Sequence, residues 1–133
     1  MKYHKDMNKQ ILLVDDDIDI TTSFKIGLEG HSFTVSVYND PKIALAEFKK
    51  GKRKYDLLLT DIRMPGMSGI ELYHKIKEKD NKIKVCFITG FQEYYPELEK
   101  ALPGLDLHKC YILKPVTISD LVDKIKAILE LEC

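Results

Sequence analysis

The sequence has no tryptophan, few cysteines and no excess of charge of either sign. Lys and Arg together number 21, as do Asp and Glu, so no net field favours a nucleic acid or a membrane as a partner. No apolar stretch approaches the roughly 20 residues of a transmembrane helix. The first ten residues are polar and lack the apolar core of a signal peptide. We therefore expect a cytoplasmic protein that makes no membrane contact and no direct nucleic acid contact.

The three cysteines and four histidines also exclude one kind of site. They show no metal-ligand spacing, so the sequence predicts no zinc centre. Cys86 and Cys110 lie within apolar runs, where cysteine usually acts as a small hydrophobe, and this agrees with a reducing compartment. One local excess of charge remains, the basic run 49–54, which we interpret as a solvated helix end and loop.

What the chain does have is a regular alternation of short apolar runs with segments of helical period. This alternation is typical of α/β domains with a parallel sheet. The length of 133 residues suits one domain. We place that domain at 10–130, after a polar segment at 1–9 and before a tail or linker stub at 131–133.

Five strands and their helices can be placed along the chain. Residues 33–38 alternate between apolar and polar, which predicts an edge strand with one polar face. The unbroken Leu57-Leu58-Leu59 predicts a strand buried on both faces. Helices are expected at 18–29, after a cap at Asn39 or Asp40, at 68–79, within 93–102 and after Thr117. Strands are expected at 10–14, 33–38, 55–60, 83–89 and 109–113.

Polar side chains stand where four of these strands end. Asp15 and Asp16 follow the first strand and Asp61 the third, while Thr89 ends the fourth strand and Lys114 the fifth. The carboxyl ends of parallel strands meet at one edge of the sheet, so we expect these five side chains to lie together. Carboxylates about 4 Å apart repel by about 4 kcal/mol at an effective dielectric of 20. The cluster therefore predicts a cation site, and oxygen ligands favour Mg²⁺.

This constellation resembles the receiver domain of two-component response regulators, and the resemblance covers nearly the whole chain. It implies a three-layer, doubly wound, flavodoxin-like fold with five parallel strands in the order 2-1-3-4-5, as in chemotaxis regulators. The edge position expected for 33–38 agrees with that order. The matching pieces are Ile11–Asp17, Leu59–Gly69, Ile88–Gly90 and Leu113–Pro115.

The resemblance implies a role for each acidic residue. Asp61 looks like the phosphoacceptor. Asp16 looks like a direct Mg²⁺ ligand and Asp15 like one that acts mainly through water. The backbone carbonyl of Arg63 would complete the protein ligands of the metal.

The resemblance also implies a switch. Thr89 resembles the hydroxyl that turns toward the phosphoryl group, and Lys114 resembles the lysine that pairs with that group. Tyr111 matches the aromatic switch position on the fifth strand, and a half-buried strand tyrosine is an equal alternative for it. The bond before Pro115 is expected to be cis, although only about 5–6% of X–Pro bonds are.

The function that follows from the resemblance is signal transduction and not turnover of a metabolite. A sensor histidine kinase or a phosphotransfer protein would phosphorylate Asp61, and the domain assists its own phosphorylation and dephosphorylation. The face of the fourth helix, fifth strand and fifth helix would then change its affinity for an output protein or a fused output domain. Family analogy also allows a phosphorylation-dependent homodimer through this face.

The chain departs from the family pattern between Thr89 and Lys114. Prolines interrupt this region, so the fourth helix is expected to be short or irregular. We consider an aromatic partner surface there, built from Phe91, Tyr94 and Tyr95, and packing over the sheet edge is an equal alternative. Arg63 and Phe91, each two residues after a site residue, are expected to slow hydrolysis of an aspartyl phosphate.

Three other functions remain as alternatives. A receiver-like binding module would work without phosphorylation, but the acid, Thr and Lys set is intact. A small Mg²⁺-dependent phosphatase that forms an aspartyl phosphate would place an acid where Arg63 stands. A flavin-binding fold would need a phosphate loop rich in Ser, Thr and Gly in place of Asp15-Asp16-Asp17.

Overall fold

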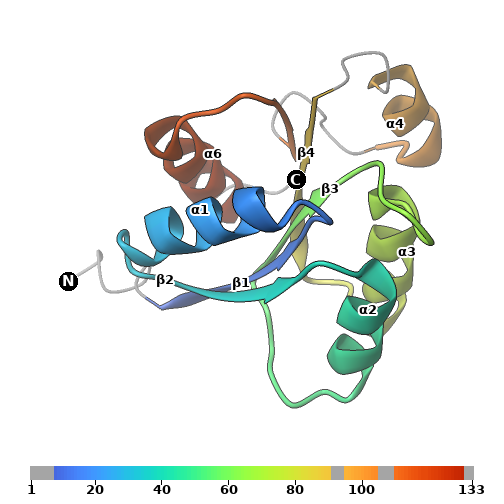
Figure 1. Ribbon diagram of the computed structural model, residues 1–133. Helices are drawn as coiled ribbons and strands as arrows, with labels where there is room; N and C mark the ends of the chain where they lie inside the picture. Colours follow the sequence, from blue (N-terminus) through green and yellow to red (C-terminus); the bar gives the residue numbers. More distant parts are fainter. Residues whose placement is uncertain (1–7, 91–94, 105–109, 131–133) are drawn as a thin grey trace.

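The computed structural model describes residues 8–90, 95–104 and 110–130. Five parallel strands form one sheet in the order β2-β1-β3-β4-β5, and helices cover both of its faces (Figure 1). This confirms the predicted doubly wound architecture and strand order. Strand β2, Phe33–Tyr38, is an edge strand as its alternating pattern predicted, and Phe33 and Val35 are buried while Thr34 and Ser36 are half-buried.

The observed elements agree with the expected ones to within two residues at most ends. The third strand begins two residues later than expected, at Leu57. The two residues before it make other contacts: Tyr55 stacks on Phe48, and the carboxylate of Asp56 accepts from the Gln10 amide at 2.7 Å. The strands are β1 Lys9–Val14, β2 Phe33–Tyr38, β3 Leu57–Asp61, β4 Lys84–Thr89 and β5 Tyr111–Leu113. The helices are α1 Ile18–Glu29, α2 Pro41–Lys49, α3 Gly69–Lys79, α4 Tyr95–Ala101 and α6 Ile118–Glu130.

Short polar side chains start these helices. Asp17 caps α1 and Ser68 caps α3, each through a side-chain oxygen that accepts from amides of the first turn. Thr117 Oγ1 accepts from the Asp120 amide at 3.0 Å at the start of α6. Of the two residues considered for α2, Asp40 is the cap, and its side chain accepts from Lys42 N. Asn39 is therefore free for another role.

The sheet separates two apolar layers. On one face, α1 and α6 pack on Leu57 and Leu59 of β3, and on the other, α2 and α3 pack on Leu58. All three leucines are fully buried, as their unbroken run predicted. Truncation of a buried leucine to alanine typically costs 2–5 kcal/mol, so this central strand, which ends on Asp61, is firmly anchored.

The region between β4 and β5 is the one that departs from the family pattern. Helix α4 is short, as expected, and Pro96 lies within its first turn, where a missing amide costs no intrahelical bond. Phe91 and Tyr94 lie outside the described residues, and so does the side chain of Tyr95, so the aromatic partner surface is a prediction that stays untested.

Two further findings concern the cysteines and the membrane. Cys86 is a free, fully buried thiol. Cys110 is buried but disulfide-bonded, which corrects the interpretation of it as a plain small hydrophobe and removes its support for a reducing compartment. Among the helices that the structure describes, none combines the length and the apolar character that crossing a bilayer requires.

Candidate functional site

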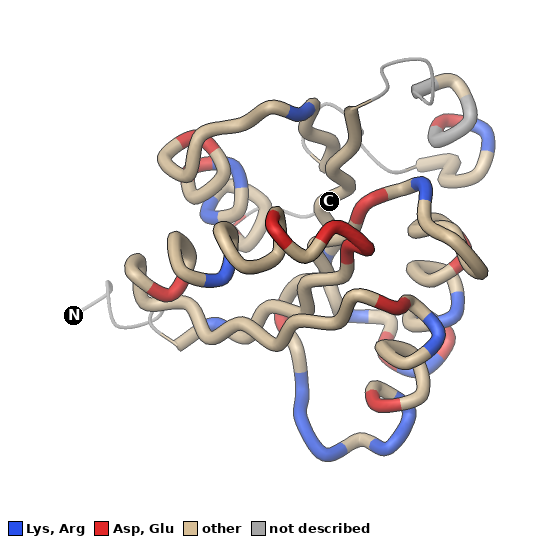
Figure 2. The backbone as a smooth tube through the Cα atoms, in the orientation of Figure 1, with Lys and Arg blue, Asp and Glu red and all other residues tan. Residues whose placement is uncertain are grey.

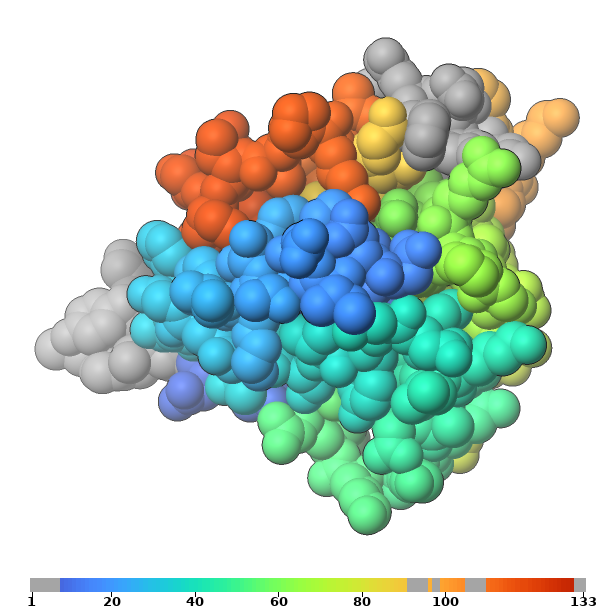
Figure 3. Space-filling model, viewed as in Figure 1, coloured from blue at the N-terminus to red at the C-terminus, as the bar shows by residue number. Residues whose placement is uncertain are grey.

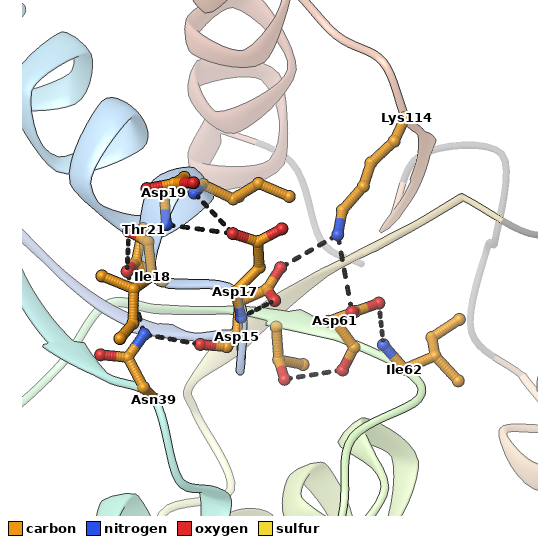
Figure 4. A network of polar contacts seen from close by, with 11 residues as sticks. Asp15, Asp17, Ile18, Asp19, Thr21, Asn39, Asp61, Ile62 and Lys114 are labelled. Carbon is orange, nitrogen blue, oxygen red and sulfur yellow. Dashed lines mark hydrogen bonds and ion pairs between the residues drawn. The ribbon is translucent and has the colours of Figure 1, made fainter.

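Three strand ends bring two carboxylates and one ammonium group together. Asp15 follows β1, Asp61 ends β3 and Lys114 follows β5, and their side chains converge at the carboxyl edge of the sheet (Figure 4). Lys114 Nζ lies 3.0 Å from Asp15 Oδ2 and 3.5 Å from Asp61 Oδ2. Asp15 and Asp61 are buried, while the Lys114 side chain is 20% exposed. The structure thus places these three predicted site residues in one cluster.

The loop that carries Asp15 is held by its neighbours. Asp15 Oδ1 accepts from the Asp17 amide at 2.9 Å, so the carboxylate closes the turn into α1. The Asn39 side-chain amide donates to the Asp15 carbonyl at 2.8 Å and to the buried Thr21 Oγ1 at 3.0 Å. These contacts join the β1–α1 loop to the end of β2. They leave Asp15 Oδ2 directed at Lys114 (Figure 4).

Asp61 is fixed through its backbone and its side chain. Its Oδ1 accepts from the Ile62 amide at 2.8 Å, and its carbonyl oxygen accepts from Thr60 Oγ1 at 2.9 Å. The start of α3 contacts the next peptide of the chain, because Gly69 N donates to the Ile62 carbonyl at 2.7 Å. A Cβ atom at Gly69 would lie only 1.9 Å from the Asp61 carbonyl oxygen. Only glycine fits there with this backbone geometry.

Lys114 enters the site from the turn after β5. Its amide donates to the Thr89 carbonyl at 2.7 Å, which ties it to the end of β4. The Lys114–Pro115 peptide bond is cis, the geometry that the family resemblance implies. The lysine thus bridges the ends of β1, β3 and β4.

The charges of the site shift one another's proton affinities. Burial raises the pKa of Asp15 and of Asp61, and a neighbouring carboxylate adds to the rise in each, while Lys114 opposes it. For Lys114, burial alone would lower the pKa, but the hydrogen bond and charge of Asp15, together with Asp61, raise it. The lysine therefore offsets part of the cost of burying these two acids, as does the Asp17 amide for Asp15.

The acidic cluster has the ligands of a hard cation. Asp15, Asp16 and Asp61 each offer one carboxylate oxygen, and these atoms all lie within 4.8 Å of one another. Asp16 is exposed while the other two are buried, so the cluster opens to solvent on the side of Asp16. An all-oxygen set with an open side suits Mg²⁺, which keeps several of its waters. Arg63, also predicted at this site, is exposed just beyond β3.

The two predicted switch residues lie close to this cluster along the strands. Thr89 ends β4 and is fully buried. Tyr111 begins β5 and is half-buried, and it packs against the apolar layer on the side of α2 and α3. In the sheet register, Phe87 pairs with Tyr111 and Thr89 with Leu113, so both residues belong to the same strand pair.

An apolar hollow of about 450 Å³ adjoins the site. It lies between α1 and the turn from β5 to α6. These two segments, blue and orange, meet in the upper half of Figure 3. Lys114 forms part of its wall, and most of the rest is apolar, including Ile20, Val116 and Ile118. A partner that fills this hollow lies directly beside the acidic cluster.

Two residues of the site were missed by reasoning from the sequence. Asn39 was considered only as a helix cap, yet its amide supports the loop of Asp15. Gly69 was treated only as part of a motif, yet it allows α3 to reach the Asp61 peptide. No local pattern marks either role, because each depends on a contact with a distant strand end.

Comparison with known proteins identifies the family to which this fold and site belong. The family model of the response regulator receiver domain matches residues 11–126. Response regulator ArlR of Staphylococcus epidermidis is 30% identical over 119 residues, which cover 90% of this chain and 52% of that protein. Response regulator receiver protein CpdR of Brucella abortus is 33% identical over 121 residues, which cover 91% of this chain and 97% of that protein. The chain spans about half the length of ArlR but nearly all of CpdR.

Solved structures agree in fold. A CheY-like receiver domain protein of Methanospirillum hungatei superposes with a TM-score of 0.79 at 34% identity, covering 92% of this chain and 94% of that one. Response regulator TrrA of Thermotoga maritima, solved in complex with Mg²⁺ and BeF, has a TM-score of 0.76 at 29% identity, covering 90% of this chain and 98% of that one.

Proposed function

Because this chain belongs to the response regulator receiver domain family, we propose that it accepts a phosphoryl group on Asp61 from a sensor histidine kinase or a phosphotransfer protein. The observation that carries this proposal is the Lys114 ammonium shared between Asp15 and Asp61 beside a third carboxylate. Such a cluster suits charge that develops on a transferring phosphoryl group. The TrrA complex with Mg²⁺ and BeF supports the role of a metal in this family.

In the proposed reaction, an Asp61 carboxylate oxygen attacks the phosphorus of a phosphohistidine. The new O–P bond forms as the N–P bond breaks, and the imidazole nitrogen leaves with the electron pair and takes a proton from solvent. Asp61 Oδ1 is held by the Ile62 amide, so Oδ2, on the side of Lys114, is the oxygen that attacks. Lys114 then moves its bonds from the two carboxylates to the phosphoryl oxygens.

The metal would be held by Asp16, Asp61 and the Arg63 carbonyl, with Asp15 acting mainly through water. Bound there, Mg²⁺ offsets the negative charge of the carboxylates and of the phosphoryl group. The positive charges of the lysine and the metal together would favour the ionised form of Asp61, which is the form that attacks phosphorus.

The apolar hollow beside Lys114 gives the phosphodonor a place to dock. A donor histidine has to come within bonding distance of Asp61, so its carrier contacts the surface next to the site. Ile20 and Val116 line this surface from α1 and from the turn before α6. Burying such apolar side chains contributes about 25 cal/mol per Å².

The output is a change in partner affinity at the face of α4, β5 and α6. Thr89 would turn toward the phosphoryl group and Tyr111 would change its rotamer as the space beside Thr89 alters. This is a two-state element biased by a local charge. The partner would be an output protein or a fused output domain, and a homodimer through this face is the alternative.

Intact mass after incubation with acetyl phosphate tests the proposal. We expect a gain of one phosphoryl group that requires Mg²⁺ and is lost in Asp61→Asn. Asp120→Asn, an exposed aspartate of α6, is the matched control and should load like the parent chain. If the parent chain fails to load from acetyl phosphate and from histidine kinases alike, a binding module that works without phosphorylation replaces this proposal.

A further inference from the structure

We propose that the end of the sheet opposite Asp61 is a docking surface for an acidic segment of a protein partner. We call this surface the basic pole and define it by Lys49, Lys52, Arg53, Lys54 and Lys79. It goes beyond the phosphoryl transfer proposed above, because it lies at the amino end of β3 while Asp61 lies at the carboxyl end. The five residues of β3 span about 13–17 Å at 3.3 Å per residue.

The basic pole concentrates charge in a chain that has none overall. Five of the six residues 49–54 are cationic, while the rest of the chain holds 16 basic and 21 acidic residues. The loop between α2 and β3 stands out from the body, mostly blue, at the bottom of Figure 2 and as a protrusion in Figure 3. Gly51, with a φ of 69°, turns the chain at the start of this loop.

The side chains of most of these cations have no direct ion-pair partner among the described residues, although Glu47 lies close enough to interact with Lys52 through its charge. Within the described part of the chain, the side chains of Lys49, Lys52, Lys54 and Lys79 make no hydrogen bond or ion pair. Three carboxylates near the pole already accept hydrogen bonds from other groups. The carboxylate of Glu47 binds Lys50, that of Asp56 binds the Gln10 amide and that of Asp80 binds the Lys82 amide. Mutual repulsion among the cations would be relieved by an anionic partner.

The pole contains a hollow with room for a side chain. A cavity of about 200 Å³ lies between the ends of α2 and α3, and its walls bring Lys49, Arg53, Lys54 and Lys79 around Phe48 and Asp80. The half-buried ring of Phe48 offers an apolar surface for the stem of an entering glutamate or aspartate. The cations at the rim would then bind its carboxylate and those of its neighbours.

The same features favour an acidic protein segment over a nucleic acid. The hollow of the pole has room for a side chain, and its Phe48 wall suits the carbon stem of a glutamate better than a sugar–phosphate backbone. The zero net charge gives no long-range attraction to a polyanion.

Titration of the ¹⁵N-labelled chain with a synthetic glutamate-rich peptide tests this inference by NMR. We expect amide shifts confined to 49–54 and to the C-terminal end of α3, and binding that weakens as salt screens the charges. Lys52→Glu/Lys54→Glu should weaken binding by at least about tenfold, because two attractive contacts become repulsive. Lys100→Glu/Lys126→Glu makes the same change of charge at exposed sites on α4 and α6 and should weaken it less than about twofold.

Three results would overturn the inference. The peptide fails to bind at low salt, or both double variants lose affinity equally, or a DNA duplex of matched charge binds the pole more tightly than the peptide. Phosphate loading is measured on the same Lys52→Glu/Lys54→Glu protein and should equal that of the parent chain. Failure of the basic pole is thereby distinguished from failure of the phosphoryl chemistry.

Discussion

Replacing Gly69 by alanine tests whether the position of α3 controls the chemistry of Asp61. The added Cβ would lie 1.9 Å from the Asp61 carbonyl oxygen, 2.9 Å from its carbonyl carbon and 3.2 Å from Ile62 Cα. Real Cβ atoms essentially never approach another atom within 3.0 Å, so one of the two backbones has to move by about 1 Å. The atoms in the way are backbone and not the end of a flexible side chain, so no rotamer change relieves the contact.

The displaced segment carries the reacting group. Asp61 Oδ1 is oriented by the Ile62 amide, and the Arg63 carbonyl proposed for the metal follows directly. A misplacement of about 1 Å commonly costs about 100-fold in rate, which is about 2.7 kcal/mol of barrier. We therefore expect Gly69→Ala to load from acetyl phosphate about 100-fold more slowly and to bind Mg²⁺ more weakly. Alanine favours a helix over glycine by about 1 kcal/mol, which offsets part of the strain in stability.

The assay is the rate of phosphoryl gain by intact mass, with Mg²⁺ affinity from calorimetry and a thermal melt on the same sample. Gly90→Ala is the matched control, because it lies beside Thr89 yet its Cβ would meet nothing within 4 Å. If Gly69→Ala stays folded and loads at the parent rate with the parent affinity for Mg²⁺, the close approach of α3 has no bearing on Asp61. The reasoning would then be wrong.

Three further predictions concern the charges and the loop of the site. Lys114→Ala leaves two buried carboxylates facing each other, so the metal-free protein should lose about 3 kcal/mol of unfolding free energy in urea. Mg²⁺ should restore part of it, and Lys126→Ala should cost almost nothing. The pKa values of Asp15 and Asp61 are raised in the folded chain, so the folded chain binds more protons than the unfolded chain above pH 3.8, the ordinary aspartate pKa. The free energy of unfolding should therefore fall as the pH rises from 3.8 through the folded pKa values, and recover on acidification. Urea unfolding in EDTA should show this slope in the parent chain, and an equal slope in Asp15→Asn/Asp61→Asn would contradict it. Asn39→Ala removes two hydrogen bonds and should cost about 1 kcal/mol and weaken Mg²⁺ binding, whereas a similar loss in the exposed Asn81→Ala would show that the effect is not specific.

Much of the fold could be predicted because its signals are local. The alternation at 33–38 identified an edge strand, and the leucines at 57–59 identified a buried one. The strand ends then predicted that Asp15, Asp61 and Lys114 would meet, because parallel strands expose their carboxyl ends at one edge. The sequence predicts the start of β3 two residues too early. Tyr55 and Asp56 precede the strand, where the Tyr55 ring stacks on Phe48 and the Asp56 carboxylate accepts from the Gln10 amide.

The remaining features depend on contacts between distant segments. Asn39 reaches back 24 residues to the Asp15 carbonyl, and no spacing rule predicts that bond. The need for glycine at 69 follows from the meeting of α3 with the Asp61 peptide, which only the folded chain defines. The disulfide of Cys110 likewise could not be read from its apolar surroundings. Residues that support a site are thus harder to predict than those that form it.

The ion pairs of Lys114 with Asp15 and Asp61 also bear on how the domain folds without a metal ion. Three carboxylates and one ammonium leave the cluster with a formal charge of minus two, which a single divalent cation cancels. Since Lys114 offsets part of the charge of the two buried acids, we expect the chain to fold without a metal ion. Metal binding should then add stability to a chain that already folds without it, in contrast to small metal-dependent domains that stay unfolded without their ion. If Mg²⁺ binds as proposed, its supply should therefore change the rate of phosphoryl loading more than the amount of folded protein.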